Sequence, residues 1–257
     1  MKTRTLLLKL SKKFPKRIAK SHHDYVGLMC GKLGEEVKKI TLCLDFDETI
    51  FPEVVANTPD LIITHHPFIY GQKSKVLKND EKKRILVEKL EKIGIPVYSF
   101  HTNFDEGIDG MNDALAEKIG LTDIKQLENA PMARGGILPK PMHIEELTKY
   151  LCQKLNVTHG IAINSGKKVI NSLAIIGGGG WYLYKVAQLE GYDCYVSGDV
   201  PHHGRRGIVV DKYNYIDLPH EIENIFMERM KKILLEMDSN LEITIVYHEK
   251  NPNAITA

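Results

Sequence analysis

Leu61-Ile62-Ile63-Thr64-His65-His66-Pro67 is the stretch that decides the fold, because a short apolar run ends there in two adjacent histidines. A run of this length and composition predicts a buried strand. Neutral imidazole is the commonest protein ligand for transition metals, and open α/β sheets bind ligands at the carboxyl ends of their strands. The stretch therefore predicts a strand with a candidate metal site at its end.

Strand and helix signals alternate on both sides of this stretch. The expected strands cover residues 40–45, 60–64, 95–100, 173–176, 194–197 and 241–247, and the expected helices cover 48–57, 82–93, 111–119, 144–155, 181–190 and 221–235. This order predicts an α/β protein with two lobes, each a mostly parallel sheet flanked by helices.

The middle of the chain is less regular. Three prolines and a Gly-Gly pair punctuate residues 130–142, and such residues are typical of turns and linkers. We therefore expect a boundary near residue 128, with an N-terminal lobe over 1–128 and a second lobe over 129–257.

Composition and charge describe an ordinary globular protein. The 257 residues are 43% hydrophobic and 26% charged, and the net charge is +2, which gives no strong electrostatic reason to expect nucleic acid as a partner. The basic residues near the N-terminus accompany an apolar stripe of helical spacing, so we interpret them as the solvated face of an amphipathic helix. These basic residues are Lys9, Lys12, Lys13, Lys16, Arg17 and Lys20.

The cysteines and the apolar runs indicate the compartment. The four cysteines are scattered without a CxxC pair, and Cys43 and Cys194 lie in strand-like runs, which favours buried free thiols. Apolar runs of membrane-spanning length are absent from the sequence, so no membrane partner is expected. We expect a cytoplasmic protein.

Two further groups repeat the chemistry of the histidine pair. His101 and Asp105 follow the expected strand 95–100, and His220 and Glu223 lie where a strand passes into a helix. Loops after adjacent parallel strands, about 4.8 Å apart, can meet, and residues three apart share a helix face. Alone, each group has an ordinary explanation: a turn pair, a helix cap at Asp105, or acids favoured by a helix N-terminus.

The strand also constrains how the histidine pair binds. Neighbouring strand residues face opposite ways, and Pro67 holds His66 extended, so both rings cannot easily reach one ion. Two ions, one for each ring, fit this backbone better.

Several motifs resemble those of the GTP cyclohydrolase I type 2 homologues, which are NIF-three-like dinuclear-metal proteins. Leu61 to Pro67 resembles the family's double-histidine motif, and His101-Thr-Asn-Phe-Asp105 resembles its H-T-x-x-D motif. Asp24 to Gly31 resembles the early D-x-x-G-L-x-x-G signature, and the segments Gly177–Gly180 and 197–199 and His220 follow in the expected order. The resemblance extends over most of the chain.

This resemblance implies a metal centre, an assembly and an activity. It implies two divalent metal ions (zinc, iron, manganese or cobalt), a toroidal homohexamer, and GTP or another nucleotide-like molecule as the substrate. By resemblance His101 lies near the site, either behind a metal ligand or facing the substrate. From the chemistry of such a centre we expect a metal-bound hydroxide as the nucleophile and His101 as a catalytic proton shuttle. The implied metal ligands are His65, His66, Asp105, His220 and a following glutamate, Glu223 or Glu221.

One departure concerns that glutamate. The family places it four residues after the last histidine, where this chain has Asn224.

Two functions stay open: a metal-dependent hydrolase, and a non-catalytic metal-binding regulatory or scaffold protein that forms a ring. Both need the same ligands, and substrate-contact residues would discriminate between them.

Two other features have open meanings. The run Gly177–Gly180 between an expected strand and helix fits either a phosphate cradle or a tight turn with close packing. His202 and His203 offer another histidine pair after a strand; we interpret them as solvent-exposed loop residues.

Overall fold

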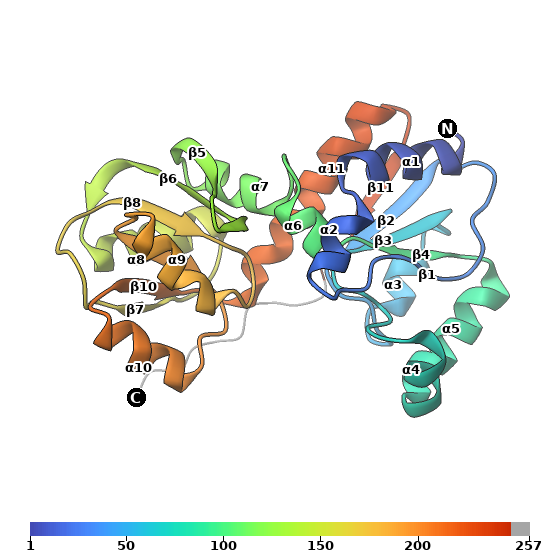
Figure 1. The fold of residues 1–257 in the computed structure, drawn as a ribbon. Coiled ribbons are helices and arrows are strands. Elements are labelled where there is room, and N and C mark those ends of the chain that lie inside the picture. Colours follow the sequence, from blue (N-terminus) through green and yellow to red (C-terminus); the bar gives the residue numbers. More distant parts are fainter. Residues whose placement is uncertain (248–257) are drawn as a thin grey trace. The chain divides into compact units, whose positions relative to one another are not determined.

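The computed structural model describes residues 1–247 of the chain, which form two compact units (Figure 1). The first unit combines Met1–Ile108 with the segment that begins at Phe226, and the second covers Asp109–Ile225. Each unit contains one sheet with helices packed against it, so the expected α/β class is confirmed.

The sheet of the first unit has five strands and is mostly parallel. Their order is β1 (Gly27–Cys30), β4 (Val97–Ser99), β3 (Leu61–Thr64), β2 (Lys39–Cys43) and β11 (Glu242–Ile245). Three of the four neighbouring pairs are parallel, and the β1–β4 pair is antiparallel. The parallel pairs align the carboxyl ends of β2, β3 and β4 at one edge, where polar side chains can gather.

Helices cover both faces of this sheet. They are α1 (Thr3–Lys13), α2 (Lys16–Ser21), α3 (Phe51–Val55), α4 (Lys73–Asn79), α5 (Glu81–Ile93), α6 (Thr102–Glu106) and α11 (Ile225–Met237). Figure 1 shows α1 and α11 on one side and α3 and α5 on the other. Ile62 and Val97 pack with Leu86 and Leu90 of α5 in one buried cluster. As expected, α5 ends at Gly94, which has the left-handed φ of 74° that glycine adopts readily.

The sheet of the second unit has six strands and a different character. Their order is β5 (Thr122–Leu127), β6 (Ala130–Met142), β8 (Ile170–Ile175), β9 (Cys194–Ser197), β10 (Asn214–Asp217) and β7 (Ile161–Ile163). Three of its five neighbouring pairs are antiparallel. The mostly parallel arrangement therefore holds for the first sheet, whereas the second is mixed. A short connection makes β5 and β6 an antiparallel pair, and the chain passes through α8 and β7 before β8 pairs antiparallel with β6.

Two helical layers enclose the second sheet. The helical segments are α7 (Met111–Lys118), α8 (Ile144–Leu155), η1 (Trp181–Leu183), α9 (Tyr184–Leu189), α10 (His202–Val210) and η2 (His220–Asn224). Leu115 of α7 and Leu147 of α8 belong to one buried cluster. Tyr184 of α9 and Ile208 of α10 belong to another.

The stretch that the sequence marks as a linker is a strand. β6 runs through Pro131, Pro139 and Pro141 and pairs with strands on both sides. Its register against β8 shifts between Ile137 and Met142, and an irregular ladder of this kind tolerates proline. Proline and glycine here therefore mark a bulged strand and not a connection between lobes.

The division between the units differs from the expected one at residue 128. The second unit begins at Asp109, because α7 packs into its core, and the chain returns to the first unit at Phe226. β11 then pairs with β2 in the first sheet. The spacing of hydrophobic residues predicts a strand but not the sheet that the strand joins. The pairing of β11 with the first sheet therefore could not be predicted from the sequence.

Three smaller features complete the fold. The N-terminal amphipathic helix is interrupted at Pro15 into α1 and α2, and the helix expected over 48–57 is limited to α3. The four cysteines are free thiols; Cys30, Cys43 and Cys194 are buried, as expected for the latter two. Among residues 1–247, every helix is too short or too polar to cross a membrane.

Candidate metal centre

The end of β3 positions the histidine pair. The strand stops at Thr64, and the backbone N–H groups of His65 and His66 both donate to the carbonyl of Leu44, at 3.2 and 3.0 Å. The Thr64 hydroxyl donates to the His66 carbonyl at 2.8 Å. These bonds turn the backbone immediately after the strand and fix where both rings point.

This turn changes the expectation of one ion per ring. Strand alternation does not apply beyond Thr64, and nitrogens of His65, His66 and His101 lie within 4.8 Å of one another. The ring centroid of His65 is 5.0 Å from that of His66 and 5.1 Å from that of His101. The backbone therefore does not force the rings apart, and all three imidazoles form one group.

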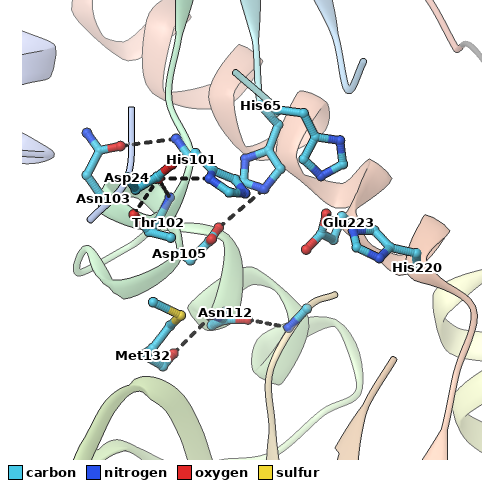
Figure 2. A network of polar contacts seen from close by, with 12 residues as sticks. Asp24, His65, His101, Thr102, Asn103, Asp105, Asn112, Met132, His220 and Glu223 are labelled. Atoms are coloured by element: carbon cyan, nitrogen blue, oxygen red, sulfur yellow. Dashed lines mark hydrogen bonds and ion pairs between the residues drawn. The ribbon is translucent and has the colours of Figure 1, made fainter. Parts of the chain in front are cut away.

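Asp105 adds a carboxylate to the same group. It lies in α6, is buried, and places Oδ1 3.5 Å from Nε2 of the fully buried His65 (Figure 2). The ring of Phe226 packs 4.9 Å from that of His65. Asp105 is not a helix cap: α7 begins after Gly110 and has no side-chain cap hydrogen bond.

Carboxylates hold the other two imidazoles. Nδ1 of His66 lies 2.7 Å from Oδ1 of Asp45, and Nδ1 of His101 lies 2.8 Å from Oδ2 of Asp24. A carboxylate at Nδ1 fixes the N–H tautomer and the ring plane, so Nε2 is the nitrogen that His66 would offer to a metal and that His101 would offer to a proton. Figure 2 shows Asp24 bridging His101 and Thr102.

Asp24 is held as an anion. Its side chain is only 3% exposed, and burial alone would raise its pKa. Hydrogen bonds from His101 and from the Thr102 hydroxyl (2.7 Å), together with the charge of His101, outweigh burial and lower the pKa of Asp24 to about 2. Its negative charge is thus present at any physiological pH.

Asn103 fixes the loop that carries His101. The Asn103 Oδ1 accepts from the backbone N–H of His101 at 3.1 Å, and its Nδ2 donates to the carbonyl of Phe14 at 2.8 Å. The loop after β4 is thereby tied to the end of α1, which explains the polar side chains of the H-T-N-F-D motif.

The second unit contains a group around His220. Nε2 of His220 lies 2.9 Å from Oε2 of Glu223, and its Nδ1 lies 2.5 Å from Oδ2 of Asp199. η2 is a 3₁₀-helix, in which residues three apart stand directly above one another. This geometry explains why a glutamate three residues after the histidine, and not four, faces it; Glu223, rather than Glu221, pairs with His220.

These carboxylates favour a cation at His220. The hydrogen bond with Glu223 is the largest effect, it outweighs burial, and Asp199 adds to it, so the pKa of His220 is raised to about 9. Glu223 is itself buried. A buried carboxylate stabilises positive charge nearby, whether a proton or a metal ion supplies it.

The glycine run makes room for this group. Gly178 has a left-handed φ of 63°, and a Cβ there would overlap Oε1 of Glu223. The Gly177 N–H donates to Oδ1 of Asn112 at 2.8 Å, and Asn112 donates in turn to the Met132 carbonyl at 3.0 Å (Figure 2). Of the two interpretations of the run, close packing is the one these contacts support.

His202 and His203 are exposed, as expected, although they begin α10 and do not lie in a loop. The ring of Trp181 lies 5.2 Å from that of His203.

The donor set fits a divalent transition metal. In the first unit three imidazoles and Asp105 converge, with carboxylates behind two of the rings; in the second, an imidazole and a carboxylate are paired. Imidazole nitrogens with carboxylate oxygens suit zinc, iron, manganese and cobalt alike. Backing carboxylates are the usual partners of metal-binding histidines.

Comparison with known proteins identifies the family. The model of the family Duf34/NIF3 (NGG1p interacting factor 3) matches residues 1–253. The chain belongs to the Duf34/NIF3 family.

Relatives of this NIF3 protein are similar over nearly the whole chain. A Lactococcus lactis protein named GTP cyclohydrolase 1 type 2 homolog is 29% identical over 98% of both chains. The crystal structure of the Staphylococcus aureus protein SA1388 has a TM-score of 0.87 at 22% identity and covers 100% of this chain and 99% of its own. Reduced HcgD from Methanocaldococcus jannaschii has a TM-score of 0.74 at 28% identity and covers 95% and 97%.

Three carboxylates of the two groups were not assigned from the sequence. Asp24 and Asp199 stand in motifs that resemble the family's, and Asp45 ends the expected strand 40–45, but the sequence pairs none of them with an imidazole. Asp45 and Asp199 each follow a strand by two residues. An acid at the end of a predicted strand, or within two residues after it, is the signal that could have found Asp45 and Asp199.

Proposed function

We propose that this chain is a metal-dependent hydrolase that acts on a nucleotide-like substrate and binds two divalent metal ions. The observation that carries the proposal is the group of three imidazoles, two of them held at Nδ1 by carboxylates. The proposed metal ligands are His65, His66, Asp105, His220 and Glu223.

The substrate class is suggested by the relatives. The Lactococcus lactis protein carries the name GTP cyclohydrolase 1 type 2 homolog, and a cyclohydrolase of this kind opens the imidazole part of the purine by hydrolysis. GTP is therefore the first substrate to test, and other nucleotides and phosphoesters form the wider class.

The bound metal ions would lower the pKa of a water molecule and stabilise negative charge on the substrate. The residues of the chain divide the remaining work. Asp24 keeps the proton of His101 on Nδ1, so Nε2 of His101 can accept or deliver a proton at the reacting group. Asp45 orients His66 in the same way, and the packing of Phe226 against His65 keeps that ring away from solvent.

Two measurements test the proposal. Elemental analysis of the purified protein should find close to two transition-metal ions per chain. The metal-loaded protein should hydrolyse GTP or a member of a nucleotide and phosphoester panel, and His66→Ala should abolish turnover. If the metal-loaded wild type turns over none of these, or His66→Ala matches it, the protein is not the proposed hydrolase, and a metal-binding regulatory or scaffold role takes its place.

We also propose a homohexamer, on the basis of the family resemblance. Light scattering should then give a mass about six times the 29.1 kDa of one chain. A monomeric mass at micromolar concentration would contradict this assembly.

A further inference from the structure

A pocket lies beside the carboxylate that holds His101. It belongs to the first unit, has a volume of about 250 Å³, and is lined by Asp24, three lysines and a set of apolar and aromatic side chains. Asp24 reaches Nδ1 of His101 at 2.8 Å, so this pocket is one side chain away from the imidazole group.

Two of the lysines lie on α2. Lys16 and Lys20 are four residues apart, so they share one face of the helix. Like charges at this spacing lower the stability of a helix, so the two lysines do not stand together for the sake of helix stability. Lys16 is held in place: its ammonium lies 5.6 Å from the ring centroid of Tyr98 and packs so closely on Gly27 that a Cβ there would clash with it.

The third lysine comes from a different part of the chain. Lys73 begins α4 and faces the same pocket. The carboxylate of Glu91 lies 3.9 Å from its ammonium, at the outer limit of an ion pair, and both side chains are about half exposed. Such a contact is weak, so an anion in the pocket can compete for Lys73.

The pocket carries a net positive charge. Among the described residues that line the pocket, only Asp24 is acidic. Its carboxylate already accepts hydrogen bonds from His101 and Thr102. Three ammonium groups from two helices around one hollow match the several negative charges of a phosphate chain.

An aromatic wall stands next to the lysines. Tyr25 is 43% exposed, and its ring packs against that of Tyr70 in a T-shaped contact with a centroid distance of 5.4 Å. Leu28, which is also 43% exposed, and the buried Ile69 continue this wall. A flat, exposed aromatic face beside apolar side chains suits the ring of an organic ligand.

We propose that this pocket binds an organic phosphate, with Lys16, Lys20 and Lys73 on its phosphate groups and Tyr25 against its ring. The ligand would be a nucleoside phosphate, and the identity of its organic part rests on the proposed function. Through Asp24 the pocket adjoins His101, so it serves as the anchoring subsite of the substrate.

Calorimetric titration of the EDTA-treated protein tests the subsite without metal. The probes are inorganic pyrophosphate, GTP and uncharged guanosine. We expect the triple variant Lys16→Gln, Lys20→Gln, Lys73→Gln to bind pyrophosphate and GTP at least 10-fold more weakly than wild type. The matched control Lys9→Gln, Lys12→Gln, Lys78→Gln removes the same charge from exposed positions outside the pocket and should change affinity less than 2-fold.

Two further variants keep the proposal falsifiable. The triple replacement of the pocket lysines by arginine keeps the charge and should retain pyrophosphate binding, which excludes a folding defect as the cause of the loss. Tyr25→Leu should weaken GTP about 10-fold and leave pyrophosphate unchanged. Equal loss in both glutamine triples, or no binding of pyrophosphate by wild type, overturns the phosphate subsite; an unchanged GTP affinity in Tyr25→Leu overturns the aromatic contact.

The phosphate subsite and the metal-dependent hydrolase can be tested independently of each other. Metal content of the pocket triple should equal that of wild type, because none of the three lysines is a proposed ligand. A wild type that binds pyrophosphate through the lysines but takes up no metal would overturn the hydrolase alone. A protein that binds two metals and hydrolyses GTP equally well in wild type and pocket triple would overturn the subsite alone.

Discussion

In the first unit, His66 and His101 each meet a carboxylate at Nδ1, whereas in the second unit His220 meets carboxylates at both ring nitrogens. The first arrangement fixes tautomers and presents several nitrogens together. The second surrounds a single imidazole with negative charge and raises its pKa to about 9. The first group therefore offers oriented imidazole nitrogens, and the second offers anionic charge.

This difference also appears in what surrounds each group. His65 is packed among aromatic rings, which include Phe226. Glu223 instead faces the backbone of Gly178, where any side chain would intrude. Apolar packing excludes water from the nitrogens of His65, and a glycine makes space for a buried carboxylate. The following predictions test this division of roles, from the largest expected effect to the smallest.

Removing a nitrogen ligand should have the largest effect. His65→Ala deletes the most buried imidazole, and we expect the metal affinity to fall by about 100-fold or more. Elemental analysis after dialysis against a graded chelator measures this loss. His203→Ala, an exposed histidine outside both groups, is the control and should keep the wild-type metal content. Unchanged metal binding in His65→Ala would remove the first unit's group from the metal centre.

Neutralising an orienting carboxylate should have a smaller effect. Asp24→Asn keeps the side-chain shape but removes the charge at Nδ1 of His101, so we expect turnover to fall about 10-fold to 100-fold. The measurement is kcat against pH for the metal-loaded protein.

The control for this variant is Asp80→Asn, which alters the N-cap of α5, where Oδ1 accepts from the Lys83 N–H at 2.9 Å. It should change stability little, because asparagine caps a helix about as well as aspartate does, and it should leave kcat unchanged. If both variants lower kcat equally, Asp24 acts through the fold and not through His101.

Gly178→Ala tests the space reserved for Glu223. Alanine at a left-handed φ costs about 1–2 kcal/mol, and the overlap with Glu223 should add about 1 kcal/mol or more. Gly94→Ala is a matched control, since Gly94 has a φ of 74° and no heavy atom within 4 Å of an added Cβ. Urea unfolding measures both; equal losses would show that the overlap relaxes without cost.

A carboxylate outside both groups gives the smallest effect. Asp193 is buried in the second unit and accepts from Lys167 at 2.5 Å and from the Asn171 N–H at 2.9 Å. Burial would raise its pKa, but these bonds and the lysine charge lower it below the ordinary 3.8.

Because its folded pKa is lowered, Asp193 stabilises the protein above pH 3.8, and this contribution disappears as the pH falls through the folded pKa. Asp193→Asn should cost about 1 kcal/mol at pH 7, discounted for the exposed Lys167. Urea unfolding at pH 7 and at successively lower pH measures the difference, which should narrow in acid. A constant difference would mean that Asp193 acts through its shape alone.

The helices and strands were predictable where the apolar residues follow the spacing of only one of these structures. The helix at Ile144–Leu155 and the strand at Cys194–Ser197 agree with the sequence because apolar spacing and flanking residues indicate one structure. β6 was missed because its prolines and glycines are usual in turns, and a bulged strand paired on both sides tolerates them. The return of the chain at Phe226 depends on pairing between β11 and β2, which local sequence does not encode.

The site was predictable in its residue types and not in its geometry. The positions of His65, His66 and His101 after strands predicted that they would gather, as they do. The expected separation of the His65 and His66 rings was wrong, because both backbone N–H groups turn toward Leu44. The choice between the glutamates depends on the 3₁₀ geometry of η2, which aligns His220 with the third residue after it, Glu223. In an α-helix the third and fourth residues would both lie near the histidine.

The sequence by itself determined the α/β class, the family resemblance and the histidines that bear the chemistry, because strand periodicity and motif spacing are local properties of the chain. Only the tertiary structure decided which carboxylate backs each imidazole and which lysines surround one pocket. Asp24 and His101 are 77 positions apart, and Lys73 is far along the chain from Lys16 and Lys20. Contacts between such distant residues depend on how the strands order within the sheet, which no local pattern specifies.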